Sequence, residues 1–278
     1  MKKFWKNANG RLKLGMVITA FFMVIGFVVY YFPHTNPFTF NSYPNKLLPS
    51  GEHWLGTTSM GQDIVWLLIE SIHNSLLIGL LVATVATITG VFVGLIAGFS
   101  GGAVDRVLTV ITDTFIVIPS LPIMILMTSL MKGSSTVFLM AMVLAIFAWA
   151  WPSRQIRSMA LSMRERDFIH TAWFSGEGTV QVVVTEILPY ALTWSLSNFM
   201  NATLAAIASE SSLAVLGLSP GNLISLGNMI QWARDRNAIF ARQWFWVGSP
   251  IVATVLLFIG LFLLITGYND YMSMKRGR

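Results

Sequence analysis

Long apolar stretches alternate with polar segments along the whole chain, which has 278 residues. Six of these stretches carry at most one charged residue each, and they cover 14–32, 75–99, 107–131, 136–152, part of 191–218, and 244–268. An α-helix needs about 20 apolar residues to cross the hydrocarbon core of a bilayer. The pattern therefore predicts an all-α, polytopic membrane protein with six transmembrane helices.

Two charges lie inside the predicted spans, Asp113 in the third and Glu210 in the fifth. A carboxylate exposed to lipid is costly, so each should face the helix bundle, water or a helix end. Either residue could line a translocation path or gate, together with Ser211 beside Glu210 and with Pro119, which can bend the third helix. The alternative is a hydrogen-bonded structural anchor, which we favour for Glu210.

The composition agrees with this class, because 55% of the residues are hydrophobic and only 11% are charged. Six spans leave no room for a separate soluble catalytic domain, and the spans contain no cluster of polar catalytic groups. Cysteine is absent, which excludes disulfides, thiolate catalysis and cysteine-ligated metals. The four histidines are far apart and have no metal-binding spacing. We expect neither an enzyme nor a metal site.

Lysine and arginine are distributed unevenly over the segments between the spans. The two terminal segments and the connections 100–106 and 153–189 hold thirteen of them, whereas the other side holds five. Positive residues concentrate on the cytoplasmic side, so both termini are predicted to be cytoplasmic. The net charge of +6 is therefore a topology signal and no sign of nucleic-acid binding. The first span is too long for a secretory signal, which predicts a retained anchor.

Three glycines, Gly90, Gly94 and Gly98, recur every four residues on one face of the second span. Small residues let membrane helices approach each other closely. This close contact could lie within the chain or at an interface with another subunit, and we favour the first.

The predicted internal segment 153–189 is much longer than a connection between antiparallel helices requires. Apolar residues between 156 and 163 have helical spacing, so the fourth helix should continue beyond the membrane. A charged cluster at 164–167 precedes a short helix at 168–175, which Gly176 can end in a left-handed conformation. So short a helix needs tertiary packing. It packs either on the ends of other helices of this chain or in a cleft on a partner protein.

Several short motifs follow one another along this hydrophobic chain. They are His53 to Thr57 with Gly61 and Asp63; the turn from Ala97 to Asp105; Asp113 with Ile118, Pro119 and Ser120; Arg154, Arg157, Ser162, Arg164 and Glu165; Gly176 with Ile187, Leu188 and Pro189; and Glu210 to Leu213 with Leu216 to Leu218 and Gly227 to Met229. Their order and spacing resemble ABC importer permeases, and more closely the second permease of the dipeptide, oligopeptide and nickel importer family. The resemblance extends over nearly the whole chain.

The resemblance implies a type I ABC importer permease fold, formed by a single domain over residues 1–278. Within it, 1–74 would be an anchor helix and external loop, 75–268 a five-helix core with the coupling loop 153–189, and 269–278 a cytoplasmic tail. The chain would be a non-catalytic subunit in the cell membrane of a prokaryote and would form half of a translocation path.

The same resemblance implies partners. They are a second homologous permease, two ABC ATPase subunits and an extracellular substrate-binding protein, besides membrane lipid. The sequence has no G-x-x-x-x-G-K-[ST] loop, so the ATPases would bind ATP and Mg²⁺ and this chain would bind no cofactor. The short helix would dock into one ATPase. The coupling residues would be Arg164, Glu165, Asp167, Phe168, Thr171, Ala172 and Gly176.

Departures from the family pattern affect the coupling segment and the external motif. His170-Thr171-Ala172 stands where the family has E-A-A, and Thr58 and Gln62 stand where it has Asp and Arg. Di- or oligopeptides are the favoured cargo, with cello-oligosaccharides or nickel as alternatives. An ion-coupled secondary transporter is a weaker rival, because the sequence has no inverted repeat and Glu210 is the one charge in the middle of a span.

Two predicted external segments, 33–74 and 219–243, are long enough to have a function. Their apolar and aromatic residues suit either a landing surface for a binding protein or an anchor at the lipid headgroups. The sequence leaves both possibilities open.

Overall fold

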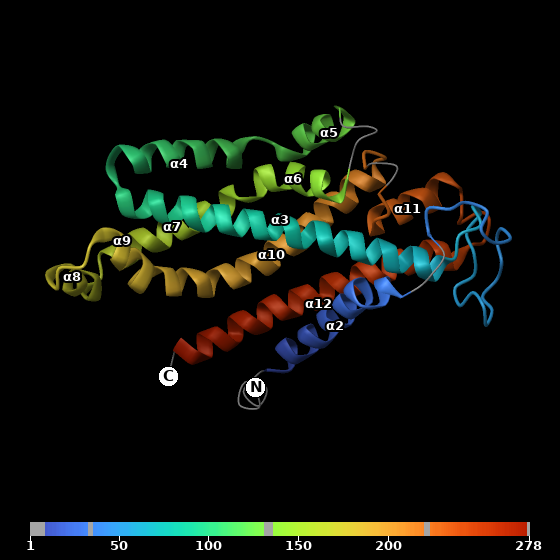
Figure 1. Ribbon diagram of the computed structural model, residues 1–278, viewed down its shortest axis with the longest axis horizontal. Helices are drawn as coiled ribbons and strands as arrows, with labels where there is room; N and C mark the ends of the chain where they lie inside the picture. The colour runs from blue at the N-terminus through green and yellow to red at the C-terminus, as the bar shows by residue number, and fades with distance from the viewer. Residues whose placement is uncertain (1–8, 33–35, 131–135, 220–222, 277–278) are drawn as a thin grey trace.

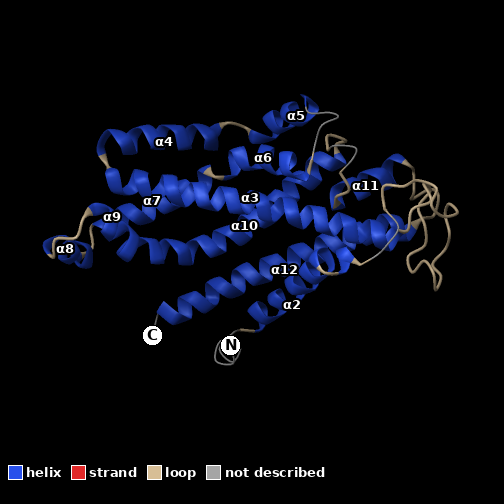
Figure 2. Cartoon of the chain, in the orientation of Figure 1, coloured by secondary structure: helices blue, strands red, loops and turns tan. Residues whose placement is uncertain are grey.

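The computed structural model describes residues 9–32, 36–130, 136–219 and 223–276, and every regular element in these ranges is a helix (Figure 1; Figure 2). The elements are α2 (Gly10–Phe27), η1 (Val29–Tyr31), α3 (Ile64–Ser100), α4 (Gly102–Val117), α5 (Ser120–Leu130), α6 (Val137–Ala148), α7 (Ala150–Arg164), α8 (Asp167–Phe174), α9 (Thr179–Val182), the π-helix η2 (Val183–Ile187), α10 (Leu188–Val215), α11 (Leu226–Asp235) and α12 (Trp244–Arg276). The predicted all-α class is confirmed. Several residues of the orientation argument lie outside the described residues: Lys2, Lys3, Lys6, Lys132 and Arg278.

α3 is 37 residues long and runs through the middle of the bundle, where it contacts α2, α6, α7 and α10 (Figure 1). α4 and α5 lie at one edge of the bundle, and the pair α2 and α12 lies at the opposite edge. α8 lies at one end of the molecule, called here the α8 end. α11 and the loop 36–63 lie at the other, the α11 end (Figure 1).

α2 and α12 form an antiparallel pair whose backbones touch. A Cβ atom at Gly15 would collide with the backbone of Leu264, and one at Gly267 would lie 2.6 Å from Cα of Leu12. Asn9 Nδ2 also donates a hydrogen bond of 3.3 Å to Asp270 Oδ2. The start of α2 and the end of α12 therefore lie side by side, towards the α8 end (Figure 1).

The start predicted for the second span, residue 75, is wrong, because α3 begins at Ile64. Asp63 caps the helix, since its Oδ1 accepts hydrogen bonds from Val65 N at 2.8 Å and Trp66 N at 3.3 Å. Polar residues in its first turns suggest a loop when only the sequence is considered. In the structure they are buried with partners, as His73 is with Gly26 O at 2.7 Å.

Two predicted spans are bent helix pairs. The third span consists of α4 and α5, which meet at 78° across Ile118 and Pro119. A proline disfavours helical geometry in the residue before it, and Ile118 is extended, so the expected bend at Pro119 is confirmed. The fourth span consists of α6 and α7, which meet at 41° and continue to Arg164 as predicted.

Three helices among the described residues are each long and apolar enough to cross a membrane: α2 with η1, α3 and α12. The two bent pairs raise this number to five if each is one span. α10 is long enough, with 28 residues, but polar groups such as Asn198, Asn201 and Ser209 interrupt it. The chain is thus a multi-pass membrane protein in which α10 carries an unusually polar face.

Candidate functional site

α8 is the two-turn helix that was expected at 168–175, and its C-terminal turn is built around Gly176. The glycine has φ of +87°, a left-handed conformation that costs other residues energy. Gly176 N donates to Trp173 O at 2.9 Å, and Glu177 N donates to Ala172 O at 3.2 Å. This pair of bonds is the Schellman motif. It reverses the chain, so that α9 returns beside α7.

The inner face of α8 packs on the ends of its own chain's helices. Ile169 is fully buried and Ala172 is 9% exposed, in one apolar cluster with Ala160 and Met163 of α7 and Ile187 of η2. Ala172, which was expected among the coupling residues, is therefore largely covered by its own chain. Its position makes it a support for the helix.

The outer face of α8 is open. Phe174 is 92% exposed and Phe168 is 36% exposed, and Thr171 lies on the same accessible side. Other expected coupling residues are also exposed, namely Glu165, Asp167 and Gly176. Arg164 is half-buried instead, because its Nη1 donates to Phe99 O at 3.3 Å. The short helix thus has one anchored face and one exposed aromatic face, on which Phe168 stacks on Tyr190 with ring centroids 6.4 Å apart while Phe174 is open.

Two arginine–aspartate pairs join α4 to α7. Arg157 binds Asp105 through two hydrogen bonds, Nε to Oδ1 at 2.5 Å and Nη2 to Oδ2 at 2.7 Å. This two-pronged geometry is the strong form of such a pair. Arg154 lies 3.6 Å from Asp113. Asp113 therefore faces a cation, with its side chain about half exposed, and the sequence motifs gave no indication that these four residues pair.

The glycine row of α3 lies against α7. A Cβ atom at Gly94 would lie 2.6 Å from Ser153 O, and one at Gly98 would lie 2.7 Å from Ala160 Cβ. Gly90 meets Pro152 in the same way. All three glycines are thus used in close packing within the chain. The contact braces α7, the helix that leads to α8, against the central helix α3.

Glu210 is fully buried at the α11 end and binds the segment that leads into α11. Its Oε1 accepts a hydrogen bond of 2.6 Å from Ser225 Oγ, and Ser225 caps α11 by accepting from Asn228 N at 3.1 Å. Next to Glu210, Ser211 Cα lies 2.6 Å from where a Cβ of Gly227 would be. Glu210 and Ser211 therefore meet at the α10–α11 contact, away from the partners of Asp113 and the bend at Pro119.

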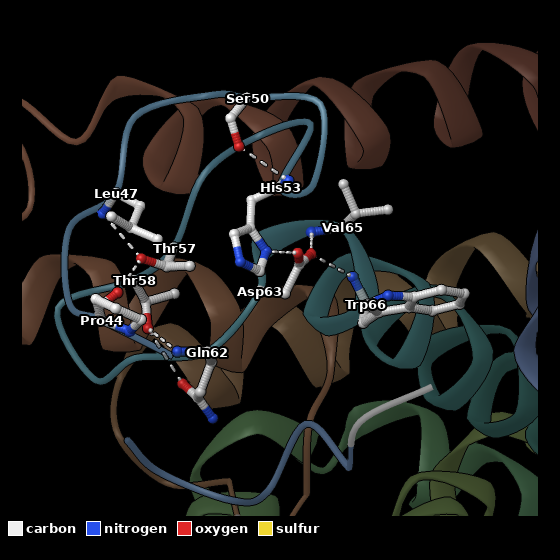
Figure 3. A network of polar contacts seen from close by, with 10 residues as sticks. All are labelled: Pro44, Leu47, Ser50, His53, Thr57, Thr58, Gln62, Asp63, Val65 and Trp66. Carbon is white, nitrogen blue, oxygen red and sulfur yellow. Dashed lines mark hydrogen bonds and ion pairs between the residues drawn. The ribbon is translucent and has the colours of Figure 1, made fainter. Parts of the chain in front are cut away.

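The motif around His53 folds into a compact cluster of polar contacts at the start of α3 (Figure 3). His53 Nδ1 lies 2.6 Å from Asp63 Oδ2, and Asp63 also caps α3. Thr57 Oγ1 donates to Pro44 O at 2.7 Å and accepts from Leu47 N at 2.9 Å. These side chains point toward one another within the cluster (Figure 3). The motif therefore has a structural role, because its hydrogen bonds hold the loop 36–63 against the start of α3.

A family model supplies the deciding comparison. Residues 90–277 match the model of the binding-protein-dependent transport system inner membrane component family. The chain belongs to this family. The match covers α4 to α12 and the last eleven residues of α3, so it includes the α8 segment and the bent pairs.

Relatives in this family carry names of two transport systems. The oligopeptide transport system permease protein OppC of Mycobacterium tuberculosis (strain ATCC 25618 / H37Rv) is 29% identical over 287 aligned positions, which span 100% of this chain and 96% of the relative. OppC of Lactococcus lactis subsp. lactis (strain IL1403) is 27% identical, over 90% of this chain and 87% of the relative. The nickel transport system permease protein NikC of Escherichia coli (strain K12) is 26% identical, over 92% of each. The expected resemblance to oligopeptide and nickel importer permeases is confirmed.

Proposed function

We propose that this family member is one permease subunit of an ATP-driven importer in a prokaryotic cell membrane. Its six spans would be α2, α3, α4–α5, α6–α7, α10 and α12, with both termini and the α8 end in the cytoplasm. A second permease would supply the other half of the translocation path. The observation that carries the proposal is α8, whose inner face is anchored while its aromatic outer face is open.

Coupling follows from how α8 is attached. ATP binding would close a pair of separate ATPase subunits, one of which holds Phe168, Thr171 and Phe174 of α8. α7 packs on α3 through the glycine row, so a push on α8 would move long helices as rigid bodies. This chain then needs stiffness and a docking surface. ATP and Mg²⁺ would be bound by the ATPases, because the sequence has no phosphate-binding loop of the usual form.

The α11 end would receive the substrate-binding protein. Trp54 is 74% exposed in the loop 36–63, and Phe240 is 87% exposed between α11 and α12. Aromatic residues at this level also suit the membrane–water interface. Both roles are compatible if the binding protein docks on this surface and the aromatic residues at its edge contact lipid headgroups.

Oligopeptides are the cargo that the named relatives suggest first, and nickel is the second candidate because NikC is among them. An ion-coupled secondary transporter remains the weaker rival. Glu210, five residues before the end of α10, has a structural partner in Ser225, which favours an anchor over an ion site. Uptake that survives collapse of the ion gradients but stops without ATP would separate the two mechanisms.

Site-specific crosslinking tests the docking of α8, since the natural chain has no cysteine. A Thr171→Cys variant, treated with a thiol–amine crosslinker in the assembled complex, should give an adduct with an ATPase subunit. Leu48→Cys is the matched control, because Leu48 is 81% exposed at the α11 end. An ATPase adduct from Leu48→Cys alone, or labelling of Thr171→Cys from outside intact cells, would overturn the proposal.

A further inference from the structure

A cavity of about 330 Å³ opens at mid-height of the bundle, at the level where both bent pairs break. Its walls are the start of α5 at Ser120, the end of α6 with Phe147, the start of α7 with Trp151, and the middle of α10. Irregular backbone at membrane depth is tolerated where it lines protein or a water-filled space. The breaks in the pairs α4–α5 and α6–α7 therefore lie beside a space that could form part of a path through the protein.

α10 presents one polar stripe to this cavity. Asn198, Asn201, Ala202, Ala205 and Ser209 all line it and follow one another at helical spacing. Of these, Asn201 and Ala205 are exposed in the isolated chain. Polar residues in a membrane helix face the protein interior or a water-filled cavity. The stripe accounts for three of the polar residues of α10, namely Asn198, Asn201 and Ser209.

The stripe has hydrogen-bonding capacity to spare. Asn198 Nδ2 is buried without a partner among the described residues. Asn201 Nδ2 donates to Ser197 O at 3.0 Å, which uses one of the two donor hydrogens of its amide. Trp151, which is 59% exposed, adds an indole ring to the same cavity. Amides and an aromatic ring together can bind neutral polar chains by hydrogen bonds and stacking.

Charge is absent from the described lining of the cavity. Four carboxylates of the described helices are engaged elsewhere: Asp105 and Asp113 with arginines of α7, Glu210 with Ser225, and Glu70 with Asn74. Nor do the described residues bring three or more histidine, aspartate or glutamate side chains together in a metal-binding group. A bare divalent cation would find neither the oxygen cage nor the imidazoles that such ions prefer.

We propose that this cavity is the cargo-contacting half-site of the path and that it takes a hydrogen-bonding chain of no net charge. Amide groups of a peptide and hydroxyl groups of a sugar share this chemistry. The inference rests on the proposed importer function and narrows its cargo. Contacts from neutral amides suit a path, because conduction requires binding weak enough for the solute to leave.

Uptake into proteoliposomes containing the complete importer tests this cargo class. Trialanine, cellotriose and nickel chloride are the probes, each with the cognate binding protein present. We expect ATP-dependent uptake of trialanine or of cellotriose, and the probe that enters identifies peptide or sugar. Asn201→Leu should lower the maximal rate about fivefold to tenfold, the effect of one lost hydrogen bond. Asn201→Gln should stay within about twofold, since it keeps the amide.

Cysteine labelling gives a second readout that does not depend on transport. Ala205→Cys should react with a charged thiol reagent, and the transported probe should slow this reaction. Leu196→Cys is the matched control, because Leu196 is 49% exposed on the opposite face of the same helix, about two and a half turns from Ala205. It should not react from the aqueous phase.

The outcomes separate the two proposals. Equal rates for Asn201→Leu and wild type, with Ala205→Cys unreactive, would overturn the cargo site and leave the importer standing. Uptake of nickel chloride alone would do the same. Failure of the wild-type complex to import any of the probes with ATP would count against both proposals.

Discussion

At the scale of single residues, each carboxylate inside the bundle or at its edge is stabilised by its nearest partner. Glu210 lies in the interior and accepts a hydrogen bond from Ser225, whereas Asp105 is held by the two-pronged guanidinium of Arg157. A buried polar group without a partner costs about 1–3 kcal/mol. These pairs therefore lower the cost of burying the carboxylates, although Glu210 Oε2 has no partner among the described residues, and they tie α10 to α11 and α4 to α7.

The anchor role of Glu210 predicts a contrast between two substitutions. Glu210→Leu leaves Ser225 without its acceptor and should lower the free energy of unfolding by about 1–3 kcal/mol. Glu210→Gln keeps an acceptor oxygen, so both stability and ATP-driven uptake should be close to wild type. Thermal unfolding of the purified protein in detergent measures the first effect, with the exposed Glu52→Gln as control. Loss of uptake in a stable Glu210→Gln protein would instead assign Glu210 to an ion or proton site.

At the scale of elements, the contact between α3 and α7 determines how rigidly α8 is mounted. Three glycines without side chains let the two backbones approach until a single methyl group would collide. Helices that touch this closely cannot slide without breaking many contacts, because packed interiors are not continuously deformable. The pair α3 and α7 is therefore the rigid unit through which the proposed push on α8 would act.

Glycine substitutions should reveal this contact. Gly94→Ala inserts a methyl group 2.6 Å from Ser153 O, and such overpacking costs about 1–3 kcal/mol. Gly248→Ala is the matched control, because Gly248 also lies in a helix but has no atom within 4 Å of the added methyl group. Thermal unfolding in detergent should show a loss of stability in the first variant only. Equal stability of the two variants would mean that α3 and α7 are less tightly joined than described.

At the scale of the whole molecule, α8 and α11 lie at opposite ends (Figure 1). The cavity lies between them, beside the breaks of the two bent helix pairs. Force applied to α8 would have to travel through α7 and α3 to alter access to the cavity. Each end is built from segments that are far apart in the chain. A movement of α8 can therefore affect access to the cavity only through the helices that join the two ends.

Disturbing the support of α8 should break this link without unfolding the bundle. Ala172→Asp places a carboxylate in the buried cluster beneath α8, so the helix should detach. We expect the assembled complex to keep ATP hydrolysis while ATP-dependent uptake falls at least about tenfold. Ala103→Asp is the control, since Ala103 is exposed at the start of α4. Normal uptake in the Ala172→Asp variant would contradict the proposed coupling through α8.

Much of the fold could be predicted because hydrophobicity is a local property. The apolar runs, the bend at Pro119, the helix at 168–175 and its end at Gly176 all follow from residues within a few positions of one another. The motifs identified the family for the same reason. The start of α3 could not be found in this way, because its polar first turns are satisfied by residues such as Gly26, 47 positions away in the chain.

The sequence by itself determined that this protein crosses a membrane several times and which family it resembles. Only the tertiary structure decided that Ala172 faces inward, that Arg157 holds Asp105, and that the polar stripe of α10 lines a cavity without charge. The physical reason is that these features depend on contacts between helices. Such contacts join residues dozens of positions apart, and no local pattern of apolar and polar residues records them.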